Sequence, residues 1–217
     1  MKINDIDVSM STKSDVVGAI KAFTKSQMYR DGIVLYRGAG KIETWFISVP
    51  PSGARTRPLD TTLWIHNTIN NVSEEINGYK MRNGVFCTED KEVTKNYGST
   101  LYVIIPTEKT IFFRHEYIAD LTGYLEADVM ENNFEAFCED QGIDTENLSS
   151  IETNNKYREF ITVDFAPSYI NGLEQLDMND HWDSSENEVI VFGDFYIVPF
   201  GYATKMINEI DPEGGYI

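Results

Sequence analysis

The stretch VIVFGDFYIV at residues 189–198 consists almost entirely of β-branched and aromatic side chains. Such side chains are enriched in strands, so we predict β-structure over residues 189–192 and 194–198. Gly193 separates the two runs, and a glycine inside a strand pattern marks either a bulge or a tight turn. The sequence leaves both alternatives open.

Upstream of this stretch, helices and strands occur in blocks. The predicted strands are residues 33–37, 84–88, 101–106 and 111–115, the last two paired through a turn at 108–109, with 41–49 as a further strand or an irregular edge. The predicted helices, placed from apolar spacing and from turn residues, are residues 11–29, 60–76, 90–97, 117–141, 168–176 and 202–210. Helices and strands in this order predict an α+β fold.

Length and composition predict one globular domain over residues 1–217. The chain has 217 residues, of which 41% are apolar, which is enough to bury a substantial core. No apolar run approaches the roughly 18 residues that a membrane helix needs. The first residues carry acids where a signal peptide would be apolar, so we expect a cytoplasmic protein without a membrane partner.

Cysteines and histidines give no sign of a metal. The two cysteines, Cys87 and Cys138, do not make a disulfide framework, and the three histidines are scattered. Because no Cys/His cluster has zinc spacing, we expect no metal.

Charge is distributed unevenly along the chain. Residues 1–100 carry 13 Lys and Arg against 11 Asp and Glu, whereas residues 101–217 carry 5 against 24. The segment of about 115–155 has no Lys or Arg, so we predict an acidic helical elaboration there. Such a surface does not suit a nucleic-acid backbone. It is either a solvated helical face or a docking surface for a basic partner.

The first candidate site residue is Arg37, within Tyr36-Arg37-Gly38 at the end of an apolar run. Its planar guanidinium matches a phosphate or a carboxylate bidentately, so it indicates either an anionic ligand or an internal salt bridge. Gly38 leaves room for close approach of the backbone to a flat ring. The basic loop at residues 55–57 is a further candidate for a phosphate contact or an acidic target, or else a solvated loop.

A second group of candidates follows at residues 85–98. Strand alternation predicts Cys87 and Glu89 on one face and Thr88 on the other. We interpret Cys87 as a small filler, because a catalytic cysteine needs an electropositive setting and a paired histidine. Tyr97, which precedes a glycine, is either a site residue or a core aromatic.

The third group is Glu186-Asn187-Glu188, directly before the stretch at 189–198. Residues two apart on an extended segment point the same way, so we expect both carboxylates to face one cleft. Two adjacent acids suit a substrate on which positive charge develops, and their crowding would favour general-base work by one of them. The alternative is an acidic turn before a strand.

Together these groups resemble the Arg / Ser-Thr-Ser / Glu-x-Glu pattern of mono-ADP-ribosyltransferases. The resemblance covers about Tyr36 to Tyr196 and implies an ADP-ribosyltransferase-like split β-sandwich with flanking helices. NAD, as substrate, would lie in the cleft. The chain departs from this pattern at Cys87 and Glu89, which stand where the family has serines, and only Thr88 keeps a hydroxyl.

The resemblance also implies roles for single residues. Arg37 and Gly38 would bind the phosphate–ribose side and the nicotinamide amide of NAD. Three further residues would line the NAD site: Cys87, Thr88 and Tyr97. Glu188 would be the catalytic glutamate, while Glu186 would serve the acceptor.

The acceptor and the source of the chain follow from the same resemblance. The Glu-x-Glu form implies an arginine acceptor on a target protein. Small acidic members resemble enzymes of bacteriophages that modify host proteins. Two other functions stay open, a non-catalytic acidic protein that captures or inhibits a basic partner and an NAD glycohydrolase.

Overall fold

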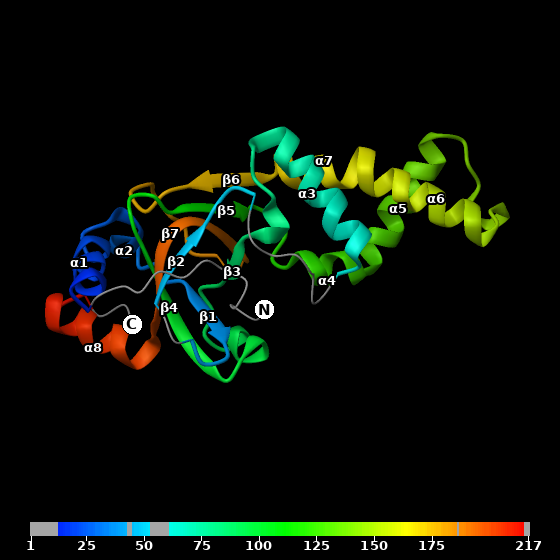
Figure 1. The fold of residues 1–217 in the computed structure, drawn as a ribbon. Coiled ribbons are helices and arrows are strands. Elements are labelled where there is room, and N and C mark those ends of the chain that lie inside the picture. Colours follow the sequence, from blue (N-terminus) through cyan, green and yellow to red (C-terminus); the bar gives the residue numbers. More distant parts are fainter. Residues whose placement is uncertain (1–12, 43–44, 53–60, 186, 215–217) are drawn as a thin grey trace.

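Strand β7 (Val189–Pro199) runs through the centre of a seven-stranded antiparallel sheet in the computed structural model, which describes residues 13–42, 45–52, 61–185 and 187–214 (Figure 1). The other strands are β1 (Tyr36–Ala39), β2 (Phe46–Val49), β3 (Val85–Cys87), β4 (Thr100–Pro106), β5 (Ile111–His115) and β6 (Leu173–Leu176). With helices on the same chain, the prediction of an α+β fold is confirmed.

The two halves of β7 have different partners. β3 and β5 pair with its first half, from Val189 to Phe192. β2 and β4 pair with its second half, from Gly193 to Pro199. β1 extends the sheet beyond β4, and β6 extends it beyond β5. One strand therefore belongs to two four-stranded halves, β1-β4-β7-β2 and β6-β5-β7-β3.

Gly193 is a bend inside the continuous strand β7 and not a turn between two strands. Its φ is +81°, and a Cβ at this position would lie 1.9 Å from the carbonyl oxygen of Lys109. The neighbouring Asp194 fixes the bend, because its carbonyl oxygen accepts hydrogen bonds from the hydroxyls of Thr107 and Thr110, each at 2.6 Å. Of the two alternatives from the sequence, the tight turn is wrong, because β7 continues through Gly193.

The predicted pairing of residues 101–106 with residues 111–115 is wrong. In the strand order, β7 lies between β4 and β5. β4 matches five residues of the second half of β7, and β5 matches four residues of the first half. Because β7 is long enough to pair with both, the two strands do not pair with each other.

The helices gather at two ends of the sheet. They are α1 (Lys13–Phe23), α2 (Gln27–Arg30), α3 (Leu63–Asn77), α4 (Leu121–Glu126), α5 (Asp128–Asp140), α6 (Ser150–Phe160), α7 (Ala166–Asn171) and α8 (Phe200–Ile210). α1 and α8 lie at one end, and α5 and α6 project beyond the sheet at the other (Figure 1). A π-helix, Ile161–Phe165, joins α6 to α7, and short 3-10 helices occur at Met81–Asn83, Val93–Tyr97 and Thr145–Asn147.

Four predicted helices differ from the structure. Residues 117–141 contain two helices, α4 and α5, separated at Ala127, and of residues 90–97 only 93–97 are helical, as a 3-10 helix. The helix predicted over residues 11–29 divides after Phe23, because Ser26 caps a new helix by accepting a hydrogen bond from the Tyr29 N–H. The helix predicted over residues 168–176 ends at Asn171, and residues 173–176 form β6. Apolar spacing could not separate helix from strand at residues 173–176, because the pairing of β6 with β5 decides the strand.

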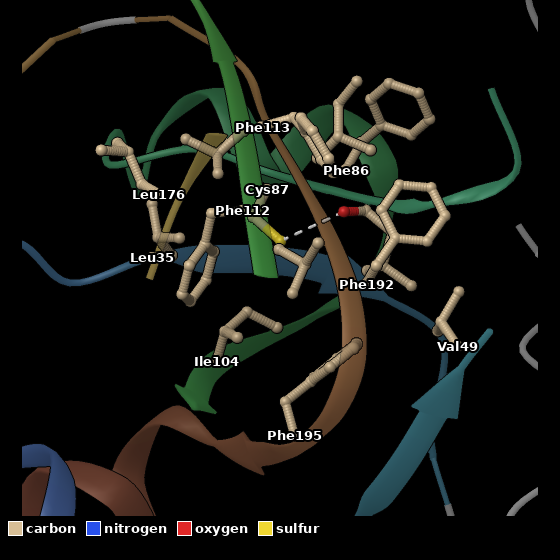
Figure 2. Packing of buried hydrophobic residues seen from close by; sticks show 14 of the residues in the cluster. Leu35, Val49, Phe86, Cys87, Ile104, Phe112, Phe113, Leu176, Phe192 and Phe195 are labelled. Carbon is tan, nitrogen blue, oxygen red and sulfur yellow. Dashed lines mark hydrogen bonds between the residues drawn. The ribbon is translucent and has the colours of Figure 1, made fainter. Parts of the chain in front are cut away.

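Aromatic side chains pack around β7. Figure 2 shows Phe112, Phe192 and Phe195 among the buried residues at its two faces. The ring of Trp182 meets Phe112 edge to face, with centroids 5.1 Å apart. Burial on both faces makes the position of β7 strongly determined.

We expect Gly193→Ala to lower the free energy of unfolding by about 1–3 kcal/mol, because a side chain there requires an unfavourable φ and meets the Lys109 carbonyl. Urea unfolding measures this difference. Gly18→Ala, in α1 with no atom within 4 Å of the added Cβ, is the matched control and should be neutral or stabilise by up to about 1 kcal/mol. Equal unfolding midpoints for both variants would contradict the role given to the bend.

Candidate functional site

Arg37, Thr88 and Glu188 line one pocket, although they lie 51 and 100 residues apart in the sequence. The pocket has a volume of about 350 Å³, within the range of small-molecule sites. Its walls come from β1, from β3 and the residues that follow it, from Ala119 and Asp120 before α4, and from the residue before β7. β1 and the end of β3 are held together by reciprocal backbone hydrogen bonds between Tyr36 and Thr88, of 2.7 and 3.1 Å.

Arg37 lies in the middle of β1 and not at the end of a strand as predicted. It is 9% exposed, and its Nη1 donates a hydrogen bond of 2.6 Å to the carbonyl oxygen of Phe86. Its guanidinium carbon lies 5.5 Å from the centre of the Tyr97 ring. In the part of the chain that the structure describes, no carboxylate pairs with Arg37, and its Nε has no hydrogen-bond partner.

The salt-bridge interpretation of Arg37 thus finds no acid among the described residues. A buried guanidinium without an ion-paired carboxylate is unfavourable, because burial removes the water that stabilises the charge. Because Arg37 lines the pocket, the pocket suits an anionic group that would pair with the guanidinium.

Gly38 and Gly98 let β1 and the 3-10 helix Val93–Tyr97 come into contact. A Cβ on Gly38 would lie 1.9 Å from the carbonyl oxygen of Thr94, and one on Gly98 would lie 2.3 Å from the backbone of Ala39. The room at Gly38 that we expected for a flat ring is thus taken by the backbone of Thr94. Gly38 still lines the pocket.

Cys87 and Thr88 both contribute to the pocket wall. Cys87 is only 3% exposed, and Figure 2 shows its side chain among the core residues. Burial raises the pKa of the Cys87 thiol to about 12. The thiol is therefore protonated at neutral pH, which fits the interpretation of Cys87 as a filler. The Thr88 hydroxyl accepts a hydrogen bond of 3.1 Å from the Asp90 N–H.

Tyr97 is 45% exposed, so the alternative that it is a core aromatic is wrong. It lies at the end of the 3-10 helix that forms one side of the pocket, with its ring over Arg37. A guanidinium beside an aromatic face is stabilised by the ring's negative face. Tyr97 thus helps to hold the Arg37 side chain in place.

Glu188 is half-buried at the pocket, and its N–H donates a hydrogen bond of 2.7 Å to the carbonyl oxygen of Ala119. Burial raises the pKa of Tyr169, and the charge of Glu188 raises it further. Two buried protonated groups, Tyr169 and Cys87, thus lie close enough to sense the Glu188 carboxylate. Glu186 and the basic loop at residues 55–57 lie outside the described residues.

Several polar residues at or near the pocket were not predicted as site residues, among them Glu89, Asn187 and Asp120. Asn187 donates hydrogen bonds from Nδ2 to the carbonyl oxygens of His115 and Glu116, at 2.8 and 3.0 Å. Asp120 caps α4 by accepting hydrogen bonds from two N–H groups. Only Glu89 carried a signal in the sequence, because it stands where a serine was expected.

No protein-family model, curated protein or solved structure matches the chain. Within the described ranges, no group of His, Cys, Asp and Glu could hold a metal ion. The helices of these ranges are all too short or too polar to cross a bilayer.

We expect the thiols of the folded protein to resist alkylation. The rise in the Cys87 pKa from 9.0 to about 12 lowers its thiolate fraction on the order of a thousandfold, and Cys138 is also buried. Iodoacetamide labelling at pH 8, followed by mass spectrometry, should modify neither thiol until urea is added. Cys87→Ala leaves Cys138 as an internal reference, and rapid labelling of native Cys87 would contradict the interpretation.

Proposed function

We propose that this protein is a mono-ADP-ribosyltransferase that cleaves NAD between nicotinamide and ribose and transfers ADP-ribose to an arginine of a target protein. The observation that supports this most is the meeting of Arg37, Thr88 and Glu188 at one pocket. A sheet whose two halves share β7 is in keeping with the split β-sandwich that we propose as its fold.

Arg37 would bind NAD through a phosphate. Its guanidinium lines the pocket and has no ion-paired carboxylate among the described residues, and its planar fork suits a phosphate. The hydrogen bond to the Phe86 carbonyl and the Tyr97 ring would fix the direction of the guanidinium. Thr88 would add a hydroxyl to the same wall.

Glu188 would stabilise the cation that forms when the glycosidic bond breaks. In this step the electron pair of the bond leaves with the nicotinamide nitrogen, and positive charge develops on the ribose. A carboxylate held beside the ribose stabilises that charge without reorganising at the moment of reaction. The backbone contact to Ala119 and the start of β7 hold Glu188 for this task.

Glu186 would serve the acceptor. A nitrogen of the target arginine would form a bond to the ribose carbon that nicotinamide leaves, and its proton would pass to the Glu186 carboxylate. We propose a host protein as the target if the chain is of bacteriophage origin.

We expect Glu188→Gln to slow nicotinamide release from NAD by about a hundred- to a thousandfold, because the amide keeps the shape of the side chain but loses its charge. Chromatography of nicotinamide released by the full chain, with and without cell lysate, measures the rate. Glu209→Gln, on the exposed surface of α8, is the matched control and should keep full turnover.

Near wild-type turnover in Glu188→Gln would reject the role of Glu188. If the wild type released nicotinamide at the same rate with and without lysate and attached no ADP-ribose to protein, the result would instead indicate an NAD glycohydrolase. No release at all by the wild type would leave a non-catalytic binding protein.

We expect Arg37→Lys to raise the Kd for NAD by about ten- to a hundredfold, since hydrogen bonds to charged groups contribute about 1.5–3 kcal/mol each and lysine lacks the planar fork. Calorimetric titration measures the Kd. Arg158→Lys, at an exposed arginine on α6 whose guanidinium carbon lies 4.9 Å from the centre of the Trp64 ring, is the matched control. Unchanged affinity in Arg37→Lys would exclude Arg37 from the NAD site.

A further inference from the structure

The loop that leads from β6 to Glu188 is anchored at successive points by Asp31, by Arg114 and then by Glu89. Asp31, after α2, accepts hydrogen bonds from the Trp182 N–H at 2.8 Å and from the His181 ring at 3.0 Å. Arg114 of β5 donates a hydrogen bond of 2.5 Å to the carbonyl oxygen of Asp183. The loop is thus held firmly well before it reaches the pocket.

Glu89 makes the next contact along this loop. One carboxylate oxygen accepts a hydrogen bond from the Ser184 hydroxyl at 2.9 Å, and the other accepts one from the Ser185 N–H at 3.1 Å. The Ser185 hydroxyl in turn accepts a hydrogen bond of 3.3 Å from the Asn187 N–H. An unbroken series of contacts therefore leads from Glu89 to the residue beside Glu188.

Glu89 also follows Thr88 directly, and Thr88 pairs with Tyr36 beside Arg37. Glu89 therefore joins the wall that carries Arg37 and Thr88 to the loop that carries Glu188. Burial raises the pKa of the Glu89 carboxyl, and the hydrogen bonds from Ser185 and Ser184 oppose that rise by stabilising the carboxylate. A serine, two carbon atoms shorter, would not span this gap with two acceptor oxygens.

We infer that Glu89 is a positioning residue that sets Glu188 relative to Arg37 and Thr88. This inference rests on the proposed function, because it assigns Glu89 a purpose in NAD cleavage. Both carboxylate oxygens are used, one by a hydroxyl and one by a backbone N–H. An amide offers only one acceptor oxygen, and alanine offers none. The two substitutions should therefore have graded effects.

The test compares Glu89→Gln and Glu89→Ala with the wild type in the full chain. We expect kcat for nicotinamide release to fall about tenfold in Glu89→Gln and up to about a hundredfold in Glu89→Ala. A misplacement of the Glu188 carboxylate by about 1 Å would have an effect of this size. The Kd for NAD should stay within about twofold, because Arg37 is not displaced. Glu92→Gln, at an exposed glutamate three residues further along, is the matched control.

Hydrogen exchange separates positioning from a general loss of stability. In Glu89→Ala, amides of residues 184–188 should exchange faster, while those of β3 and β7 keep their protection. Faster exchange throughout the sheet, or an unchanged kcat in an active protein, would overturn the positioning role. Absence of NAD cleavage by the wild type would instead reject the proposed function, and with it the purpose given to Glu89.

Discussion

The hydrogen-bonded pairing of β7 on both edges is the constraint on which the rest of the structure depends. Four strands find their partner in this one segment, and its two halves serve different pairs of strands. The left-handed φ of Gly193 allows the change of direction between the halves, and the carbonyl of Lys109 fills the space that any side chain would need. A single backbone position therefore determines how the two halves of the sheet meet.

The pocket follows from this arrangement. β1 belongs to one half of the sheet and β3 to the other, and they touch where Tyr36 pairs with Thr88. Arg37, one residue beyond this bridge, and Glu188, one residue before β7, both line the pocket. Residues far apart in sequence thus reach the same place because the strands that carry them share β7, directly or through β4.

Local sequence patterns predicted what depends on local chemistry. The helix at 63–77, with Gly78 in the left-handed conformation after it, and the strand character of 189–198 were both legible. The partner of each strand could not be predicted, because residues 101–106 and 111–115 fit the pattern of a hairpin although β7 lies between them in the sheet. The candidate site could be assembled only through a resemblance, since no spacing rule links Arg37 to Glu188. Glu89 was visible only as a departure, because its partners lie 95 and 96 residues away.

Two exceptions to the rules of a stable interior lie at or beside the pocket. Arg37 is a buried cation without an acid among the described residues, and Glu89 keeps its carboxyl half-buried although burial raises its pKa. Each is unfavourable for folding alone, and a hydrophobic or smaller side chain would remove the cost. Sites that break the rules of a stable interior are expected where function requires them. Because both residues flank the pocket that Thr88 and Glu188 line, the unfavourable electrostatics of the fold point to the same site as the geometry does.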